Sequence, residues 1–312
     1  MKKNFQPGAP RMAGIAPRSI KDCGVLFAKG FCMGTADVVP GVSGGTMALV
    51  LGIYEQLLYA IKAIDWQFVR RLTAFQVRRA LGGVPLLFLA SLFAGILAAV
   101  FTLAKTLSWL LNNHPVGTWS FFFGLILSSA LLVGRRIESW QAGTCAGLIA
   151  SAVAAYGLVG IVPLSTPESW PFLFLCGAIA ICAMVLPGIS GSFILVLLGK
   201  YQTILDAVHQ FDLMTLIVFA AGAGTGLVFF VRLLNWLLAR YHTITLACLT
   251  GLMIGSLRKI WPWKMVAMEG GAQQAVNVLP QAFNLEFGLA VGLALAGMMT
   301  VAALQWLALR GR

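Results

Sequence analysis

Long apolar segments constrain this chain more than any other feature. Ten such segments lie at roughly 22–39, 42–61, 84–111, 118–134, 142–163, 172–186, 189–208, 212–239, 243–257 and 284–309. A helix needs about 20 predominantly apolar residues to cross a bilayer, and several of the segments reach that length. Of the 312 residues, 59% are hydrophobic and only 10% are charged. We therefore predict an all-α, polytopic membrane protein.

The basic residues are distributed unevenly along the chain, which has a formal net charge of +12. Lys and Arg gather in residues 1–21, in the loop at 62–79 and at 135–136. Cytoplasmic loops of membrane proteins carry an excess of Lys and Arg, so we place these segments and both termini in the cytoplasm. The stretch "RKIWPWK" at 258–264 is a local exception, because it falls on the outer side. Residues 1–21 have no apolar core and cleavage site, and we interpret them as a cytoplasmic basic tail. The charge pattern thus reports orientation and gives no indication of nucleic acid.

One short pattern interrupts the apolar run twice. "VVPGVSGG" at 38–45 and "VLPGISGS" at 185–192 align at an offset of 147 residues, where 12 of 32 positions in 30–61 and 177–208 are identical. A second match at an offset of 127 pairs Lys105 with Arg232 and "WLL" at 109–111 with "WLL" at 236–238. The chain therefore consists of two similar halves, predicted as 22–165 and 166–312.

Each half contains one broken hairpin and three ordinary spans. The hairpin adds no crossing if it is re-entrant and two crossings if both arms span, so a half has three or five. Because either count is odd, the two halves must have opposite orientations in the membrane. Inverted repeats of this kind place a substrate site between discontinuous helices near the middle of the bilayer.

The breaks contain groups suited to an anion. Pro removes a backbone donor and ends one half-helix, and the next half-helix presents N–H groups and a positive dipole end. Serine and threonine hydroxyls flank both breaks, and glycine lets a ligand approach the backbone. The candidate substrate-binding residues at the breaks are Pro40, Gly41, Ser43, Gly44, Gly45, Thr46, Pro187, Gly188, Ser190, Gly191 and Ser192. The aligned Tyr54 and Tyr201, and Lys29 shortly before the first break, complete this set.

Two basic residues lie inside apolar segments. Lys105 and Arg232 occupy equivalent positions in the two halves and would neutralise a bound anion if they face the interior. The alternative is that their long side chains extend to the membrane interface. For the Pro-Gly breaks, the corresponding alternative is a packing kink without a ligand, although the duplication of the breaks favours a site.

Only the first half supplies carboxylates near its break. Asp37 and Glu55 align with Met184 and Gln202. A carboxyl group buried in an apolar environment binds a proton more readily, so both are candidates for proton coupling. The alternative for each is a structural hydrogen bond or a position at the membrane interface.

Signals for catalysis or metal binding are weak. His114, His209 and His242 lie near span ends without metal-binding spacing, and no G-x-S-x-G elbow occurs. The six Cys are scattered singly, so no disulfide framework or zinc site is indicated. "GVSGG" would need an activating His to act as a nucleophile, and none is well placed. We predict a transporter without a cofactor or metal, with a membrane-embedded lipid-phosphate enzyme as the less favoured class.

The two motifs resemble signatures of a known family. "KGFCMGTADVVPGVSGGTMALVLGIYEQLL" at 29–58 and "LPGISGSFILVLLGKYQTIL" at 186–205 are similar to those of the bacterial polyprenyl-phosphate (undecaprenyl phosphate) transporter family of the PopT type, formerly domain of unknown function 368. The likeness extends over roughly 22–310. It implies a flippase in the cytoplasmic (inner) membrane that returns undecaprenyl phosphate from the outer to the inner leaflet for cell-wall synthesis.

A small soluble anion is the alternative substrate, because helix N-termini would bind it equally well. The shape of the cavity distinguishes the two substrates. An enclosed pocket favours a soluble anion, whereas a lateral opening between helices favours a lipid. The predicted partners are a polyprenyl-phosphate lipid and the membrane lipids around it.

Overall fold

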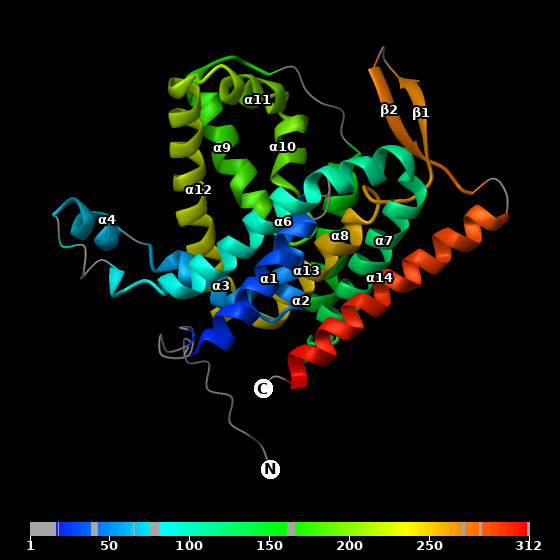
Figure 1. Ribbon diagram of the computed structural model, residues 1–312, viewed down its shortest axis with the longest axis horizontal. Coiled ribbons are helices and arrows are strands. Elements are labelled where there is room, and N and C mark those ends of the chain that lie inside the picture. The colour runs from blue at the N-terminus through cyan, green and yellow to red at the C-terminus, as the bar shows by residue number, and fades with distance from the viewer. Residues whose placement is uncertain are drawn as a thin grey trace.

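Figure 1 shows the computed structural model of the chain, which describes residues 17, 19–38, 43–64, 66–74, 76, 81–160, 166–269, 272–280 and 283–310. The first half contains α1 (Ile20–Val38), α2 (Gly44–Val50), α3 (Tyr54–Lys62), α4 (Trp66–Thr73), α6 (Leu86–Asn113), α7 (Pro115–Gly134) and α8 (Ala142–Val159). The second half contains α9 (Trp170–Val185), α10 (Gly191–Leu197), α11 (Tyr201–His209), α12 (Leu213–Arg240), α13 (His242–Ser256) and α14 (Leu285–Arg310). Strands β1 (Lys264–Glu269) and β2 (Ala272–Asn277) form an antiparallel hairpin between α13 and α14.

Apart from α4, which lies in the basic loop at 62–79, the helices coincide with the apolar segments predicted from the sequence. Within the described residues, five helices are long and apolar enough to cross a membrane, or up to seven if each of two bent helix pairs is one span. Two further apolar helices, α9 and α13, are shorter, with 16 and 15 residues. Helices suit a bilayer because they satisfy their backbone polar groups internally. The prediction of an all-α polytopic membrane protein is confirmed.

Each half contains a bent helix pair after its Pro-Gly break, and the two pairs share their backbone geometry. The sequence analysis predicted the breaks but not these second bends. The α2–α3 pair bends by 118° and the α10–α11 pair by 111°. Gly52 and Gly199, which align in the sequence, have φ of 68° and 63° in the two bends, where glycine is favoured. The next residues also match, since Ile53 has φ −112° and ψ 1° and Lys200 has φ −111° and ψ 0°. The structure therefore repeats locally where the sequence repeats.

Closely packed helix pairs form the body of each half. α1 lies against α6, and α9 lies against α12. A Cβ atom on Gly95 of α6 would collide with the Phe27 carbonyl of α1, and one on Gly222 of α12 would collide with the Phe174 carbonyl of α9. Small residues allow this close approach of membrane helices, and here they do so at aligned positions.

The remaining pairs join the two halves. α7 packs on α14, where Gly124 faces the Ala294 carbonyl. α13 packs on α8, where Gly255 faces the Ala152 carbonyl. Each of these pairs takes one helix from 22–165 and one from 166–312. The two predicted repeats therefore interlock through their last helices.

The two broken hairpins lie at opposite ends of α12. α11 precedes the start of α12 and packs against it, whereas Asn235 near the end of α12 donates a hydrogen bond to the Leu58 carbonyl of α3 at 3.3 Å. In Figure 1, α11 and the β-hairpin lie at the end of the molecule away from the start of α1 and the end of α14. Each end of the molecule thus has one bent hairpin.

Candidate functional site

The two predicted breaks meet inside the protein. Ser43, the N-cap residue of α2, donates from Oγ to the carbonyl oxygens of Met184 and Leu186 at 3.1 and 3.2 Å. These carbonyls lie at the C-terminal end of α9, where a helix leaves its last carbonyl groups without intrahelical partners. Ser43 is only 1% exposed. Ser43, at the start of the first half-helix, thus bonds the terminal carbonyl groups of the helix that leads into the second break.

Two further hydroxyl groups connect the breaks. The Tyr54 hydroxyl donates to the Val185 carbonyl at 3.0 Å, and Thr46 Oγ1 accepts from the Gly188 N–H at 2.9 Å. Gly188 has φ 91°, which a side chain would strain, and a Cβ atom there would also crowd Ser256 Oγ. The structure therefore brings together four of the residues that the sequence predicted for the site.

Asp37 binds the start of α2. Its Oδ1 accepts from the Gly44 N–H at 2.6 Å, while the Gly45 N–H donates to Ser43 Oγ at 3.1 Å. The sequence analysis expected these two N–H groups to be free for an anion. In this structure they are bonded within the chain, because a carboxylate and a serine hydroxyl are both favoured at a helix N-terminus. Asp37 thus makes the structural hydrogen bond that was the alternative for it.

The second break has no equivalent carboxylate. Met184 aligns with Asp37 and lies beside Gly191 at the start of α10. Ser190 makes no side-chain cap hydrogen bond, and its Oγ lies 2.7 Å from Ser192 Oγ. Pro187 is buried, whereas Pro40 and Gly41 of the first break lie outside the described residues. The second break is therefore the more available of the two for an external acceptor or anion.

The other predicted residues lie away from this junction. Lys29 Nζ donates to the Leu51 carbonyl in the first bend at 3.2 Å. Tyr201 is partly exposed at the start of α11. Glu55 is exposed, and its Oε1 lies 3.5 Å from His242 Nε2. An exposed pair of this kind contributes little to stability.

Lys105 and Arg232 occupy equivalent exposed positions on α6 and α12. Neither side chain makes a hydrogen bond or ion pair with another residue in the part of the chain that the structure describes. The structure therefore does not connect them with the breaks. Their exposure agrees with side chains that extend toward a membrane interface or a wet surface.

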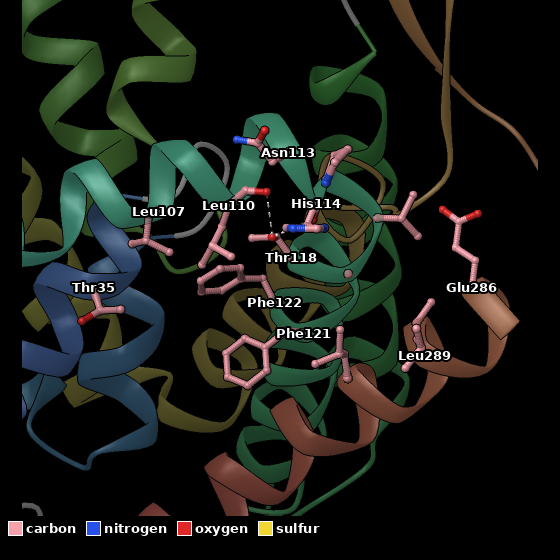
Figure 2. Close-up of a pocket in the computed structure, with 15 residues that line it drawn as sticks. Thr35, Leu107, Leu110, Asn113, His114, Thr118, Phe121, Phe122, Glu286 and Leu289 are labelled. Atoms are coloured by element: carbon pink, nitrogen blue, oxygen red, sulfur yellow. Dashed lines mark hydrogen bonds between the residues drawn. The ribbon is translucent and has the colours of Figure 1, made fainter.

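A cavity of about 680 Å³ lies between α6, α7 and α14 (Figure 2). Its walls are mainly apolar, with Leu107, Phe121, Phe122 and Leu289 among them. In Figure 2 it extends from Glu286 on α14 to Thr35 on α1, which is two residues before Asp37. Ligand pockets typically have volumes of about 300–1,000 Å³ and mostly apolar walls. The size and lining of this cavity suit an extended hydrocarbon.

A second cavity of about 400 Å³ shares Pro115, Val116 and Glu286 with the first. Lys264 lines it and places Nζ 4.3 Å from the centre of the Trp119 ring. Burial, and secondarily the charge of Lys259, lowers the pKa of Lys264 to about 8. A cationic group therefore lies beside the apolar cavity, at the end of the molecule that carries the β-hairpin.

Lys259, in the turn that follows α13, lies near the second break. Its Nζ lies 4.4 Å from the centre of the Phe193 ring on α10, and burial lowers its pKa. The sequence analysis did not assign Lys259 or Lys264 to the site. The signal was present, since both belong to "RKIWPWK", the exception to the distribution of basic residues. No cluster of His, Cys, Asp and Glu able to hold a metal ion occurs among the described residues.

Replacement of Thr46 by Val tests the contact between the breaks. The change removes the acceptor of the buried Gly188 N–H, and an unpaired buried donor costs about 1–3 kcal/mol. We expect Thr46→Val to lower the free energy of unfolding by that amount in detergent. Thr102→Val is the matched control, because exposed Thr102 donates only to its own helix, to Ala98 O at 2.6 Å and more weakly to Ala99 O. Equal stability of the two variants would contradict the contact.

Comparison with known proteins gives a consistent result. A family profile described as undecaprenyl phosphate translocase-like matches residues 33–278. The chain is 49% identical to a polyprenyl-phosphate transporter of Vibrio cholerae over 238 residues, which cover 76% of this chain and 77% of the relative. It is 31% identical to a polyprenyl-phosphate transporter of Staphylococcus aureus over 254 residues, which cover 75% and 84% of the two chains. No solved structure has significant similarity to it.

Proposed function

Because the chain belongs to the undecaprenyl phosphate translocase-like family, we propose that it moves undecaprenyl phosphate across the cytoplasmic membrane. The observation that carries this proposal is the apolar cavity that extends from α14 toward the junction of the two breaks. A lipid phosphate needs an apolar path for its tail and a polar path for its head. In this proposal the cavity takes the tail and the junction takes the head.

The tail is assigned to the cavity between α6, α7 and α14. Phe121, Phe122 and Leu289 provide the apolar surface, and the cavity is not closed off by protein on all sides. A long polyprenyl chain can therefore keep most of its length in the bilayer while its first units enter the protein. This arrangement favours a lipid over the alternative substrate, a small soluble anion, which would be held in an enclosed polar pocket.

The head is assigned to the polar groups of the breaks. Ser190 and Ser192 supply hydroxyls at the second break, and Lys259 lies next to it on Phe193. At the first break, Ser43, Gly44 and Gly45 become donors when the phosphate replaces their partners within the chain. Lys105 and Arg232 are proposed to balance the charge of the phosphate as it leaves or enters along α6 and α12.

Asp37 offers a physical link between a proton and the head group. The ionised carboxylate accepts from the Gly44 N–H, at the position where a phosphate oxygen would bind. A proton on Asp37 weakens this bond and makes the N–H available. We assign proton coupling to Asp37 rather than to Glu55, because Glu55 is exposed and paired with His242.

The two halves act as inverted repeats in this proposal. One bent hairpin lies toward each end of α12, and alternating access opens the junction first toward one hairpin and then toward the other. Both termini are proposed to lie in the cytoplasm. The lipid is proposed to move from the outer to the inner leaflet, where it is recycled for cell-wall synthesis. The chain transports the lipid phosphate without covalent change, and acts as a carrier rather than an enzyme.

The substrate class is tested in proteoliposomes that contain the full-length protein. One arm measures the leaflet position of a fluorescent polyprenyl phosphate, and the other measures the uptake of radioactive inorganic phosphate. Imposed pH and voltage gradients are applied in both arms. We expect the lipid to change leaflets and inorganic phosphate to remain outside. Uptake of inorganic phosphate without movement of the lipid would overturn the proposed substrate.

A further inference from the structure

A buried lysine lies in the bend of the second hairpin. Lys200, between α10 and α11, is only 5% exposed. It lines a cavity of about 210 Å³ together with Glu168, Ser169, Trp170, Leu173, Thr203 and Thr215. The cavity shares no lining residue with the break junction. Its lining residues on helices belong to the first turns of α9, α11 and α12, and Figure 1 shows α11 at one end of the molecule.

The ammonium group of Lys200 makes no hydrogen bond or ion pair within the described part of the chain. No hydrogen bond from Nζ is present there, and Glu168 is exposed and forms no ion pair with it. The residue as a whole is buried, while its unbonded ammonium group still reaches accessible space. A lysine placed in this way beside a small cavity is positioned to bind an anion from outside the chain.

Apart from the exposed Glu168, whose carboxylate does not favour an anion, the polar part of the lining is suited to the same ligand. Ser169 is the N-cap residue of α9, a helix of 16 residues, and its side chain makes no cap hydrogen bond. The N-terminal end of α9 thus adds a favourable dipole and N–H donors, although Pro171 in its first turn has no N–H. Thr203 contributes a further hydroxyl, while the Thr215 hydroxyl is already bonded to Asp212 Oδ2 at 2.7 Å.

The first half supports the functional importance of this lysine. Its aligned residue is Ile53, which is buried and has the same backbone conformation. The backbone conformation of the bend therefore does not require a lysine at this position. Lys29 supplies the cation in the first half, where it bonds the Leu51 carbonyl of the bend, and its aligned residue is Cys176, which interacts electrostatically with Lys200. Each half places one lysine at its bend, but from a different position.

We propose that the Lys200 cavity binds a phosphate-type oxyanion. Lys200 provides the charge, and Ser169, Thr203 and the start of α9 provide hydrogen-bond donors. The anion is either the head group of a lipid phosphate or free phosphate, since both present the same oxygens. If it is the lipid, the cavity is a receiving position on the α11 side, and this version rests on the proposed transport function.

The test measures binding to the full-length protein in nanodiscs. The probes are farnesyl phosphate, as a short lipid phosphate, and inorganic phosphate. The probe that binds the wild-type protein is called the effective probe. We expect Lys200→Ile, which introduces the residue found at the aligned position of the first half, to weaken binding of this probe at least about tenfold. Lys200→Arg should bind like the wild type, and so should Lys62→Met, which removes an exposed lysine at the end of the equivalent hairpin.

A second readout uses the wild-type protein and so does not depend on how variants fold. Sulfo-NHS-acetate modifies accessible lysines, and mass spectrometry follows Lys200 and Lys62 in the same sample. The effective probe should protect Lys200 and leave Lys62 unchanged. Protection by farnesyl phosphate alone identifies a lipid head group, and protection by inorganic phosphate identifies a soluble anion.

Two results would overturn the proposal: a folded Lys200→Ile variant that binds both probes like the wild type, or no protection of Lys200 by either probe. Neither result depends on transport. A wild-type protein that moves no lipid but shows Lys200-dependent binding would refute the transport function and leave this site in place.

Discussion

Replacement of Gly117 by Phe should stop lipid-phosphate transport while the protein still folds. Gly117 lines the apolar cavity, and a Cβ atom there meets only the Leu293 side chain, which also lines the cavity, at 2.9 Å. The end of a leucine side chain can move aside, so we expect little loss of stability. The phenyl ring fills the path that is assigned to the tail. We expect the rate of flipping to fall at least about tenfold, or about 1.4 kcal/mol in barrier height.

Gly143→Phe is the control for this prediction. Gly143 also lies in the first turn of its helix, α8, but a Cβ atom there meets nothing within 4 Å. The leaflet assay in proteoliposomes, with equal amounts of each folded variant, measures both rates. A Gly117→Phe protein as fast as Gly143→Phe would show that the tail does not use this cavity.

Neutralisation of Asp37 should remove the dependence of transport on pH. In the proposed mechanism, the protonation state of Asp37 decides whether the Gly44 N–H is bound within the chain or available to the phosphate. Asp37→Asn cannot exchange a proton, so its transport rate should stay nearly constant where the wild-type rate changes with pH. Leaflet exchange measured between about pH 5 and pH 8, the range in which shifted carboxyl groups titrate, checks this.

Glu55→Gln is the matched variant for Asp37→Asn. Glu55 is exposed and lies near His242, so its neutralisation should leave the pH profile of the wild type in place. A flat profile in Glu55→Gln together with a normal profile in Asp37→Asn would transfer the proton to the Glu55–His242 pair. An unchanged profile in both variants would remove carboxylate-based coupling altogether.

The local structure of the chain was predictable because it depends on neighbouring residues. The length of an apolar segment predicts a membrane helix, and a Pro-Gly pair predicts where a helix ends. The predicted segment 84–111 became α6, and 189–208 became the α10–α11 pair. The repeat offset of 147 also placed Gly52 and Gly199 in equivalent bends. The β-hairpin at 264–277 was not predicted, because the analysis followed apolar runs of membrane length and these strands have six residues each.

The hydrogen bonds between residues far apart in the sequence were not predictable from the same patterns. Ser43 bonds carbonyl groups more than 140 residues away, and no periodicity specifies such a pair. The sequence analysis treated the N–H groups at the start of α2 as free. The sequence does not show whether the Gly44 N–H binds the carboxylate of Asp37, seven residues earlier, or an external phosphate. Lys200 was not assigned to a site, since its burial depends on which helices pack around the bend.

The central claim is that the phosphate head crosses between the two breaks, and one measurement tests it most directly. The leaflet position of a labelled polyprenyl phosphate is followed in proteoliposomes with a Ser43→Ala, Ser190→Ala double variant. Ser129→Ala is the control, because Ser129 is a buried serine that bonds only a carbonyl of its own helix. We predict that the double variant is slower than the wild type by at least about tenfold, and that Ser129→Ala is not. Flipping at the wild-type rate in the folded double variant would contradict the account.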